Sequence, residues 1–191
     1  MNVHFSAPKQ KILDNVEYYR RIIKVIHNQG HILTQDWVEP TFEQAKSNRA
    51  SSELNWRTIY RDNMEALAKA DVVIIDTTVS NFAIGYMTAI GLQHKKPTLL
   101  LFRDNAIEDT MASGMDESLV ESQEYNDANL EEVVTEFLEK NRVETKDMRF
   151  NFFIDRPIYN YLRWASYKTG KTKAEILRDL VSREIEKQNT P

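Results

Sequence analysis

Side chains that could carry out chemistry follow directly after several apolar runs of this sequence. Asp76 ends one run, Ser6 follows another, and Arg103 follows a third. If the runs are parallel strands, these side chains meet beyond the carboxyl ends of the strands, where ligands bind in open parallel sheets. A carboxylate there can act as a general acid or base. Asp76 can also be a turn residue that begins the segment 77–81, which is the more ordinary role for an aspartate at this place.

Several other chemistries lack the residues that they require. Cysteine is absent, which excludes disulfides and thiolate metal sites, and the four histidines show no metal-ligand spacing. The sequence also lacks a Walker-type glycine loop, a dinucleotide-binding fingerprint and the G-x-S-x-G motif of serine hydrolases. We therefore expect no metal ion and no cofactor.

The composition indicates a soluble globular protein. The chain has 191 residues, of which 41% are hydrophobic and 28% are charged, enough for one ordinary domain and a small appendage. No run approaches the roughly 18 apolar residues of a transmembrane helix, and the N-terminus lacks the basic and then apolar order of a signal peptide. With the absence of cysteine, these features predict a cytoplasmic protein without a membrane partner.

Strand and helix patterns alternate through the first three quarters of the chain. A polar stretch at residues 40–52 is expected to connect two of the elements. The alternation predicts an α/β fold with right-handed crossovers, namely a flavodoxin-like parallel sheet of about five strands with helices on both faces. The expected strands are 3–6, 31–34, 71–76, 97–102 and an edge strand near 123–125, and the expected helices are 16–26, 54–70, 81–94 and 130–139.

One resemblance runs through most of this region. It rests on residues 70–103, which contain D-V-V-I-I-D and G-Y-M, on G-H-I-L-T-Q-D-W-V at 30–38, on Phe5-Ser6, and on residues 124–138. In their order and spacing these segments resemble the nucleoside 2-deoxyribosyltransferase superfamily. The resemblance is closest to the branch that hydrolyses the N-glycosidic bond of deoxynucleoside 5′-monophosphates, and it covers about residues 1–142.

The resemblance fails at the residue that the chemistry of the family requires. The family motif after the third strand reads G-[YM]-E, and its glutamate attacks the anomeric carbon of the sugar. Here the motif is Gly85-Tyr86-Met87. A thioether has no anionic oxygen, so it can neither form the glycosyl ester nor stabilise an oxocarbenium ion. Losing a covalent nucleophile commonly lowers the rate by a factor of roughly 10⁴ to 10⁶, so Met87 predicts that the usual reaction is impaired.

Two aspartates are candidates to replace the missing carboxylate. The resemblance matches Asp71 to a family aspartate that helps to position the sugar and the leaving group. A residue at such a helix-to-strand junction can also simply bond nearby backbone N–H groups. Asp76 is the better substitute acid or base, because it ends the strand and faces the expected pocket.

The resemblance also implies ligand contacts. Ser6 and Lys9 lie in the first loop, where the monophosphate branch uses serine and arginine to hold the phosphate. Asn81 could donate to a phosphate or sugar oxygen, or it could cap the following helix. Trp37 and Trp56 could each stack on a base or pack in the core. The expected ligand site consists of Ser6, Lys9, Asp76, Asn81, Gly85 and Met87.

The end of the chain carries a separate pattern. Residues 148–155 alternate, with Phe150, Phe152 and Ile154 on one side, as a half-buried strand requires. Two amphipathic helices follow, separated by Thr169–Thr172. One strand and two helices of this size cannot bury their own apolar faces, so we expect the unit to pair with a copy of itself. The arrangement resembles the ribbon-helix-helix family of DNA-binding proteins, in which two chains lay a two-stranded ribbon into the major groove.

The resemblance to this second family implies specific contacts with bases. Three outward side chains of the strand meet base edges in the family, and the matching residues are Arg149, Asn151 and Phe153. Arginine can bond guanine, and asparagine can bond adenine, in a bidentate fashion. Phe153 could contact a thymine methyl group, or it could mean that this face of the ribbon is buried against protein.

Phosphate contacts are expected at the start of the last helix. Thr172, flanked by Lys171 and Lys173, places free N–H groups and two cations toward a phosphate. From Lys146 onward there are ten Lys and Arg against six Asp and Glu, whereas the preceding residues have 15 against 23. A basic tail on an acidic body suits DNA binding, but the tail could also serve dimerisation alone.

These observations favour a homodimeric regulator, or a dimer of dimers, that binds double-stranded DNA through residues 148–191. Residues 1–142 would form a nucleoside- or nucleotide-binding domain with impaired catalysis, and residues 143–147 would form the linker. Ligand binding could then change the position of the two tails relative to each other, and with it the affinity for the DNA site. The alternative is an active N-glycosidase or 2-deoxyribosyltransferase that uses another carboxylate, with the tail serving only to dimerise.

Overall fold

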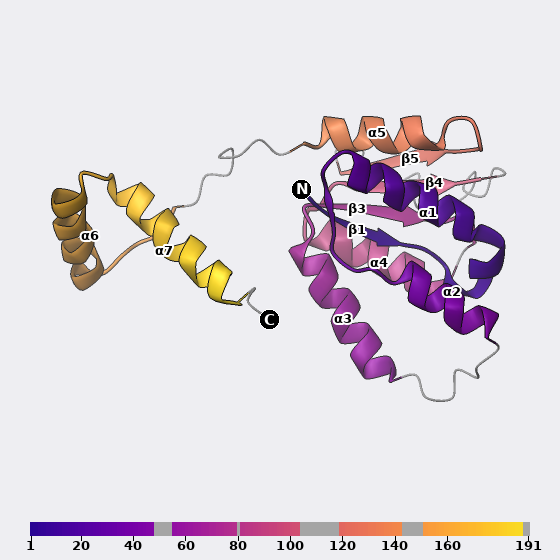
Figure 1. The fold of residues 1–191 in the computed structure, drawn as a ribbon, viewed down its shortest axis with the longest axis horizontal. Helices are drawn as coiled ribbons and strands as arrows, with labels where there is room; N and C mark the ends of the chain where they lie inside the picture. The colour runs from indigo at the N-terminus through magenta and orange to yellow at the C-terminus, as the bar shows by residue number, and fades with distance from the viewer. Residues whose placement is uncertain (48–54, 80, 104–118, 143–150, 189–191) are drawn as a thin grey trace. The chain divides into compact units, whose positions relative to one another are not determined.

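The chain folds into two compact units, Met1–Glu144 and Thr145–Pro191. The computed structural model describes residues 1–47, 55–79, 81–103, 119–142 and 151–188 (Figure 1). Buried apolar residues form two clusters in the first unit and a small separate cluster in the second. Among the residues that the structure describes, no helix combines the length and the apolarity that crossing a membrane requires.

The first unit contains a five-stranded parallel sheet. Its strands are β1 (Asn2–Ser6), β2 (Ile32–Leu33), β3 (Val72–Asp76), β4 (Thr98–Phe102) and β5 (Val120–Glu124). The strand order is β2-β1-β3-β4-β5, and every neighbouring pair is parallel. This is the flavodoxin-like order, with its switch point between β1 and β3. It confirms the fold class that the alternating sequence pattern predicts.

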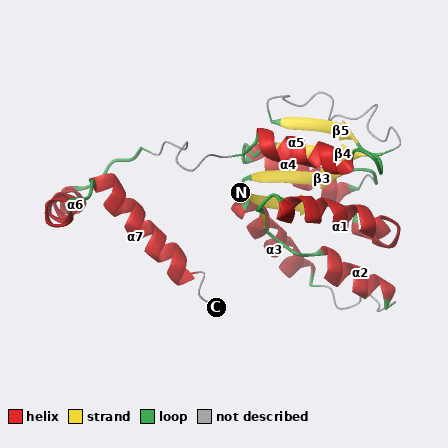
Figure 2. Cartoon of the chain, turned by 45° about the horizontal axis from the view of Figure 1, so that its top comes forward, coloured by secondary structure: helices red, strands yellow, loops and turns green. Residues whose placement is uncertain are grey.

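Helices cover both faces of the sheet (Figures 1 and 2). They are α1 (Ile12–Asn28), α2 (Val38–Lys46), α3 (Trp56–Lys69), α4 (Phe82–Gln93) and α5 (Leu130–Lys140), with a short 3₁₀ helix η1 (Lys9–Lys11). On one face the core joins α1, α2 and α5 to Val72 and Ile74 of β3. On the other face it joins α3 and α4 to Val73 and Ile75. Successive side chains of a strand point to opposite faces, so β3 is buried on both sides, as a central parallel strand requires.

One helix occurs where the sequence pattern predicts only a polar connection. α2 begins at Val38 and occupies the first part of the stretch 40–52. Only a few of its side chains, among them Val38 and Phe42, pack against the core of the first unit. Such a sparse apolar stripe is too short to stand out as a helical period. The helix therefore depends on packing against its neighbours more than on its own pattern.

The described part of the second unit contains two helices, α6 (Arg156–Thr169) and α7 (Lys173–Gln188). α6 ends at Gly170, whose φ of 72° lies in the left-handed region that favours glycine. α7 begins with a capping box. The N–H of Thr172 donates to the carboxylate of Glu175 at 2.7 Å, and the N–H of Glu175 donates to the hydroxyl of Thr172 at 3.2 Å. The glycine stop and the threonine cap agree with the sequence pattern.

The second unit leaves much of its apolar surface exposed. Its buried residues are Leu162, Ala165 and Ile176. Its exposed large side chains include Ile158, Tyr161, Trp164, Leu180, Val181 and Ile185. In the predicted strand, residues 151–155 form no strand within the described part of the chain, and 148–150 lie outside it. A ribbon strand obtains its backbone hydrogen bonds from a second chain, so the ribbon stays a prediction.

The difference in burial between the central strand β3 and the edge strand β2 can be tested by its effect on stability. Ile74 of β3 is fully buried, whereas Ile32 of β2 is 66% exposed. We expect Ile74→Ala to lower the free energy of unfolding by about 2–5 kcal/mol, because it leaves a cavity in the core. The matched change Ile32→Ala should cost less than about 1 kcal/mol. Urea denaturation followed by circular dichroism measures both, and equal losses would contradict this arrangement of the core.

Candidate functional site

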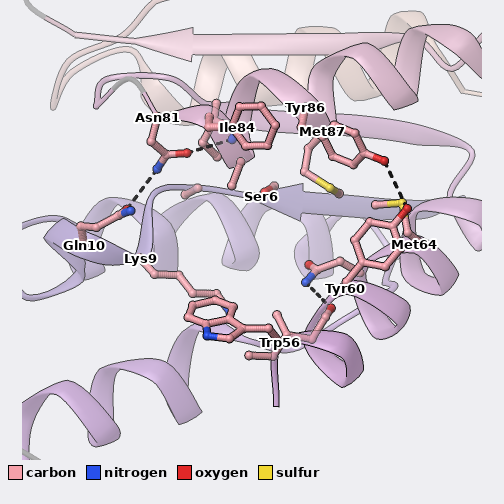
Figure 3. Close-up of a pocket in the computed structure, with 15 residues that line it drawn as sticks. Ser6, Lys9, Gln10, Trp56, Tyr60, Met64, Asn81, Ile84, Tyr86 and Met87 are labelled. Carbon is pink, nitrogen blue, oxygen red and sulfur yellow. Dashed lines mark hydrogen bonds between the residues drawn. The ribbon is translucent and has the colours of Figure 1, made fainter. Parts of the chain in front are cut away.

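A cavity of about 390 Å³ opens at the carboxyl end of β1, with walls formed by α3 and α4 (Figure 3). Its volume falls within the range of about 300–1,000 Å³ that is typical of small-molecule sites. Polar side chains from the loop after β1 face it, together with aromatic and thioether side chains from the helices. The lining residues are Ser6, Ala7, Lys9, Gln10, Trp56, Ile59, Tyr60, Asn63, Met64, Asn81, Phe82, Ala83, Ile84, Tyr86 and Met87.

The cavity brings together four of the residues that the sequence predicts as ligand contacts. Ser6 and Lys9 come from the end of β1 and the loop after it, and Asn81 and Met87 come from the start of α4 and its second turn. Gly85 does not line the cavity. It lies on the exposed side of α4, where a Cβ atom would meet nothing within 4 Å.

Met87 belongs both to the core and to the cavity wall. Its side chain is only 6% exposed and packs in the cluster that contains Val73 and Ile75 of β3. The same side chain lines the cavity (Figure 3). The thioether therefore occupies the cavity at the sequence position that the superfamily resemblance matches to a glutamate.

Neither of the two candidate aspartates lines the cavity. Asp71, just before the amino end of β3, is exposed, and its carboxylate accepts the N–H of Asn2 at 2.7 Å. Asp76, at the carboxyl end, is 1% exposed. It accepts the N–H of Thr78 at 2.9 Å and the hydroxyl proton of Tyr125. Among the described residues, no carboxylate lines the cavity, and no three His, Cys, Asp or Glu side chains gather as metal ligands.

A buried polar cluster surrounds Asp76. Burial, together with the negative charge of Asp76, raises the pKa of Tyr125 well above its usual value. The guanidinium of Arg103 lies 4.0 Å from the ring centroid of Tyr18 and 5.4 Å from that of Tyr125, and it donates to the side chain of Asn15. The cluster therefore links the ends of β3, β4 and β5 to α1. Its contacts satisfy the hydrogen-bonding capacity of the buried carboxylate of Asp76.

The polar end of the cavity is held by hydrogen bonds within the protein. Asn81 caps α4, since its Oδ1 accepts the N–H of Ile84 at 2.9 Å. Its Nδ2 donates to Oε1 of Gln10 at 3.0 Å. Lys9 places its ammonium 5.5 Å from the ring centroid of Trp37, and burial lowers the pKa of Lys9. The capping role of Asn81 is thus present, and its amide also joins α4 to the loop after β1.

The two tryptophans have different roles. Trp37 is buried, its indole N–H donates to the carbonyl of Phe5 at 2.8 Å, and its ring stacks on Phe5 with centroids 5.9 Å apart. Trp37 is therefore a core residue. Trp56 is 71% exposed and lines the cavity, which leaves its ring accessible to a ligand.

Sequence reasoning did not select the other aromatic residues of the cavity. Tyr60 lies one turn after Trp56 on α3, and Tyr86 lies one turn after Phe82 on α4. The two tyrosine hydroxyls are 3.1 Å apart, and both residues line the cavity. Aromatic pairs with a spacing of four residues on two expected helices are the sequence signal that could have identified them.

The predicted base contacts lie only partly within the described residues. Arg149 is outside them. Asn151 and Phe153 are exposed, and the side chain of Phe153 is completely so. Complete exposure of a phenylalanine agrees with contact to a partner, but it does not distinguish a thymine methyl group from a protein surface.

The predicted phosphate contacts at the start of α7 make bonds within the second unit. The ammonium of Lys171 pairs with Asp179 at 2.7 Å. The N–H of Thr172 is used by the capping box with Glu175, and Lys173 lies 4.4 Å from the ring centroid of Tyr159. A phosphate at this helix end would therefore have to displace the carboxylate of Glu175, which already benefits from the helix dipole.

Comparisons with known proteins match the first part of the chain. The chain is 22% identical over 140 residues to a 5-hydroxymethyl-dUMP N-hydrolase from Esox lucius, over 72% of this chain and 95% of that protein. No family model matches. The sequence match supports the superfamily resemblance.

Two solved structures show weaker likenesses. A CMP N-glycosidase from Clostridium botulinum superposes with a TM-score of 0.49 at 13% identity, over 72% of this chain and 98% of that one. The constitutive lysine decarboxylase of E. coli superposes with a TM-score of 0.35 at 15% identity, over 88% of this chain and 20% of that one. The fold assignment rests on the strand order of the sheet itself.

The contribution of the Asp76 cluster to stability can be tested by removing the hydroxyl group of Tyr125. Tyr125→Phe removes only the donor to the buried carboxylate, and we expect the free energy of unfolding to fall by about 1–3 kcal/mol. The matched change Tyr167→Phe, at a side chain of α6 that is 93% exposed, should cost less than about 0.5 kcal/mol. Urea unfolding compares them. A Tyr125→Phe variant as stable as the wild type would count against the cluster as a structural element.

Proposed function

We propose that the chain is a DNA-binding regulator whose first unit holds a nucleoside or nucleotide without cleaving its glycosidic bond. The observation that carries the proposal is the thioether of Met87 on the cavity wall, at the position of the family nucleophile. A thioether supplies neither covalent attack on the anomeric carbon nor an anion beside an oxocarbenium ion. The ligand is therefore bound and released unchanged.

The choice of ligand rests on three kinds of support. The sequence resembles a superfamily that acts on nucleosides and nucleotides, and the N-hydrolase from Esox lucius is named for a nucleotide. The cavity has the volume of a small-molecule site. It also combines polar groups from Ser6 and Asn81 with exposed aromatic rings, which suits a sugar joined to a planar base.

Loss of catalysis is tested by looking for free base. Purified protein incubated with deoxynucleosides and deoxynucleoside 5′-monophosphates should release no base detectable by liquid chromatography. Met87→Glu should raise base release by at least about a hundredfold, because it adds a carboxylate where the nucleophile is expected. Met64→Glu, a matched change in the same cavity, should not. Base release by the wild type at the rate of the Met87→Glu variant would contradict the proposal.

A second candidate is an active N-glycosidase. It is favoured by the sequence match to an enzyme that is named as an N-hydrolase. The match covers 95% of the length of that enzyme. This hypothesis requires that a carboxylate other than the family glutamate acts on the sugar. Base release by the wild type that is abolished in an Asp76→Asn variant of unchanged stability would support it.

The DNA-binding part of the proposal is supported by the second unit. Its two capped helices follow a segment whose pattern resembles the ribbon strand, and its residues are more basic than the rest of the chain. Its exposed apolar side chains need a covering surface, which a second copy of the unit would supply. A ligand in the first unit needs a coupling free energy of only about 1–3 kcal/mol to change DNA affinity noticeably.

DNA binding is tested with duplexes selected from a random library. Wild-type affinity should fall as salt rises, because basic side chains release counterions from the DNA. Arg149→Ala should weaken binding by about 1–3 kcal/mol and relax the preference at one base pair. Arg61→Ala, an exposed arginine of α3, is the matched control and should leave affinity unchanged. A wild-type protein with no salt-sensitive affinity for any duplex would contradict the proposal.

A further inference from the structure

The cavity is bordered by aromatic side chains that are unusually exposed. Trp56 is 71% exposed, Tyr60 54% and Phe82 87%, and all three line the cavity. Exposed apolar surface gathered at one concave place is typical of a ligand site. The rings of Phe82 and Tyr86 stack with centroids 6.1 Å apart and planes inclined by 20°. Exposed aromatic rings bind planar rings by stacking.

A pair of hydroxyl groups lies in the wall of the same cavity. The hydroxyls of Tyr60 and Tyr86 are 3.1 Å apart, and either can be the donor. Whichever donates, the other keeps a free O–H, and lone pairs remain on both oxygens. The pair therefore offers a donor and an acceptor together. Figure 3 shows it at the opposite end of the cavity from the contact between Asn81 and Gln10.

The described residues that line the cavity carry little positive charge. Lys9 is the single cation among its described lining residues. Its ammonium lies over the ring of Trp37, 5.5 Å from the ring centroid, so it already interacts with the protein. A phosphate monoester carries a charge of about −1.5 to −2 at neutral pH. The described lining residues provide no arginine for a bidentate phosphate contact, so a monophosphate would be poorly compensated.

We infer that this cavity selects a nucleoside over its 5′-monophosphate. The base stacks on the exposed aromatic rings of Trp56 and Phe82 that border the cavity, and its edge is hydrogen-bonded by the hydroxyl pair of Tyr60 and Tyr86. The inference rests on the proposed function and narrows its ligand to one class. It also separates this chain from the N-hydrolase of Esox lucius, which is named for a monophosphate.

The charge selectivity is tested by calorimetric titration of the full-length wild type. The probes are the four common deoxynucleosides and their four 5′-monophosphates. We expect the best deoxynucleoside to bind more tightly than its monophosphate. A monophosphate that binds as tightly as its nucleoside, or more tightly, would overturn the inference.

The role of the hydroxyl pair is tested with variants that lose only one oxygen atom. Tyr60→Phe and Tyr86→Phe should each weaken binding of the best deoxynucleoside by about three- to tenfold, the usual effect of one hydrogen bond. Tyr167→Phe removes an exposed hydroxyl in the second unit and is the matched control. Unchanged affinity in both cavity variants would overturn the assignment of the base edge to this pair.

The outcomes separate this inference from the proposed function. Tight binding of a monophosphate with weak binding of its nucleoside overturns the inference and leaves a nucleotide-binding regulator intact. Absence of binding by all eight compounds overturns the ligand of the proposed function, and the inference falls with it. Tight nucleoside binding that depends on both tyrosine hydroxyls supports the two together.

Discussion

Burial of both faces of the central strands is the constraint on which the first unit depends. Every residue of β3 is buried, with its side chains shared between the two helical layers. Each parallel neighbour has to be reached through a crossover helix, and this leaves the carboxyl ends of the strands along one edge. The cavity forms at that edge because α3 and α4 must cover one face of the sheet. Its place in the fold follows from core packing and needs no contact with a ligand.

The same packing explains how a chain of this fold tolerates a methionine at the position matched to a catalytic carboxylate. Met87 is nearly buried and touches the apolar cluster of β3 and α4. A carboxylate in such surroundings is costly unless it is paired, and catalytic sites commonly carry this kind of cost in stability. A thioether packs without it. Met87 therefore affects both the chemistry of the cavity and the stability of the sheet, and the described lining residues include no carboxylate.

The second unit differs from the first, because its described residues bury few apolar side chains. Three residues form its buried cluster, while a larger number of apolar side chains on α6 and α7 stay exposed. Two helices of this length cannot bury enough surface to be stable alone. Capping at both Gly170 and Thr172 fixes the helix ends locally but adds no apolar burial. The proposed regulator would cover the exposed side chains by pairing with a second copy of this unit.

The sequence by itself determined the order of the strands and of the helices other than α2, the helix stop at Gly170 and the cap at Thr172, and the presence of a thioether at position 87. Periodicity and capping are local properties, so they can be recognised in one segment at a time. Tertiary structure alone decided that Asp76 is a satisfied buried carboxylate, because its partner Tyr125 lies 49 residues away. It also brought together Tyr60 and Tyr86, 26 residues apart on different helices. Contacts between helices depend on how those helices pack on the sheet, and no local pattern contains that geometry.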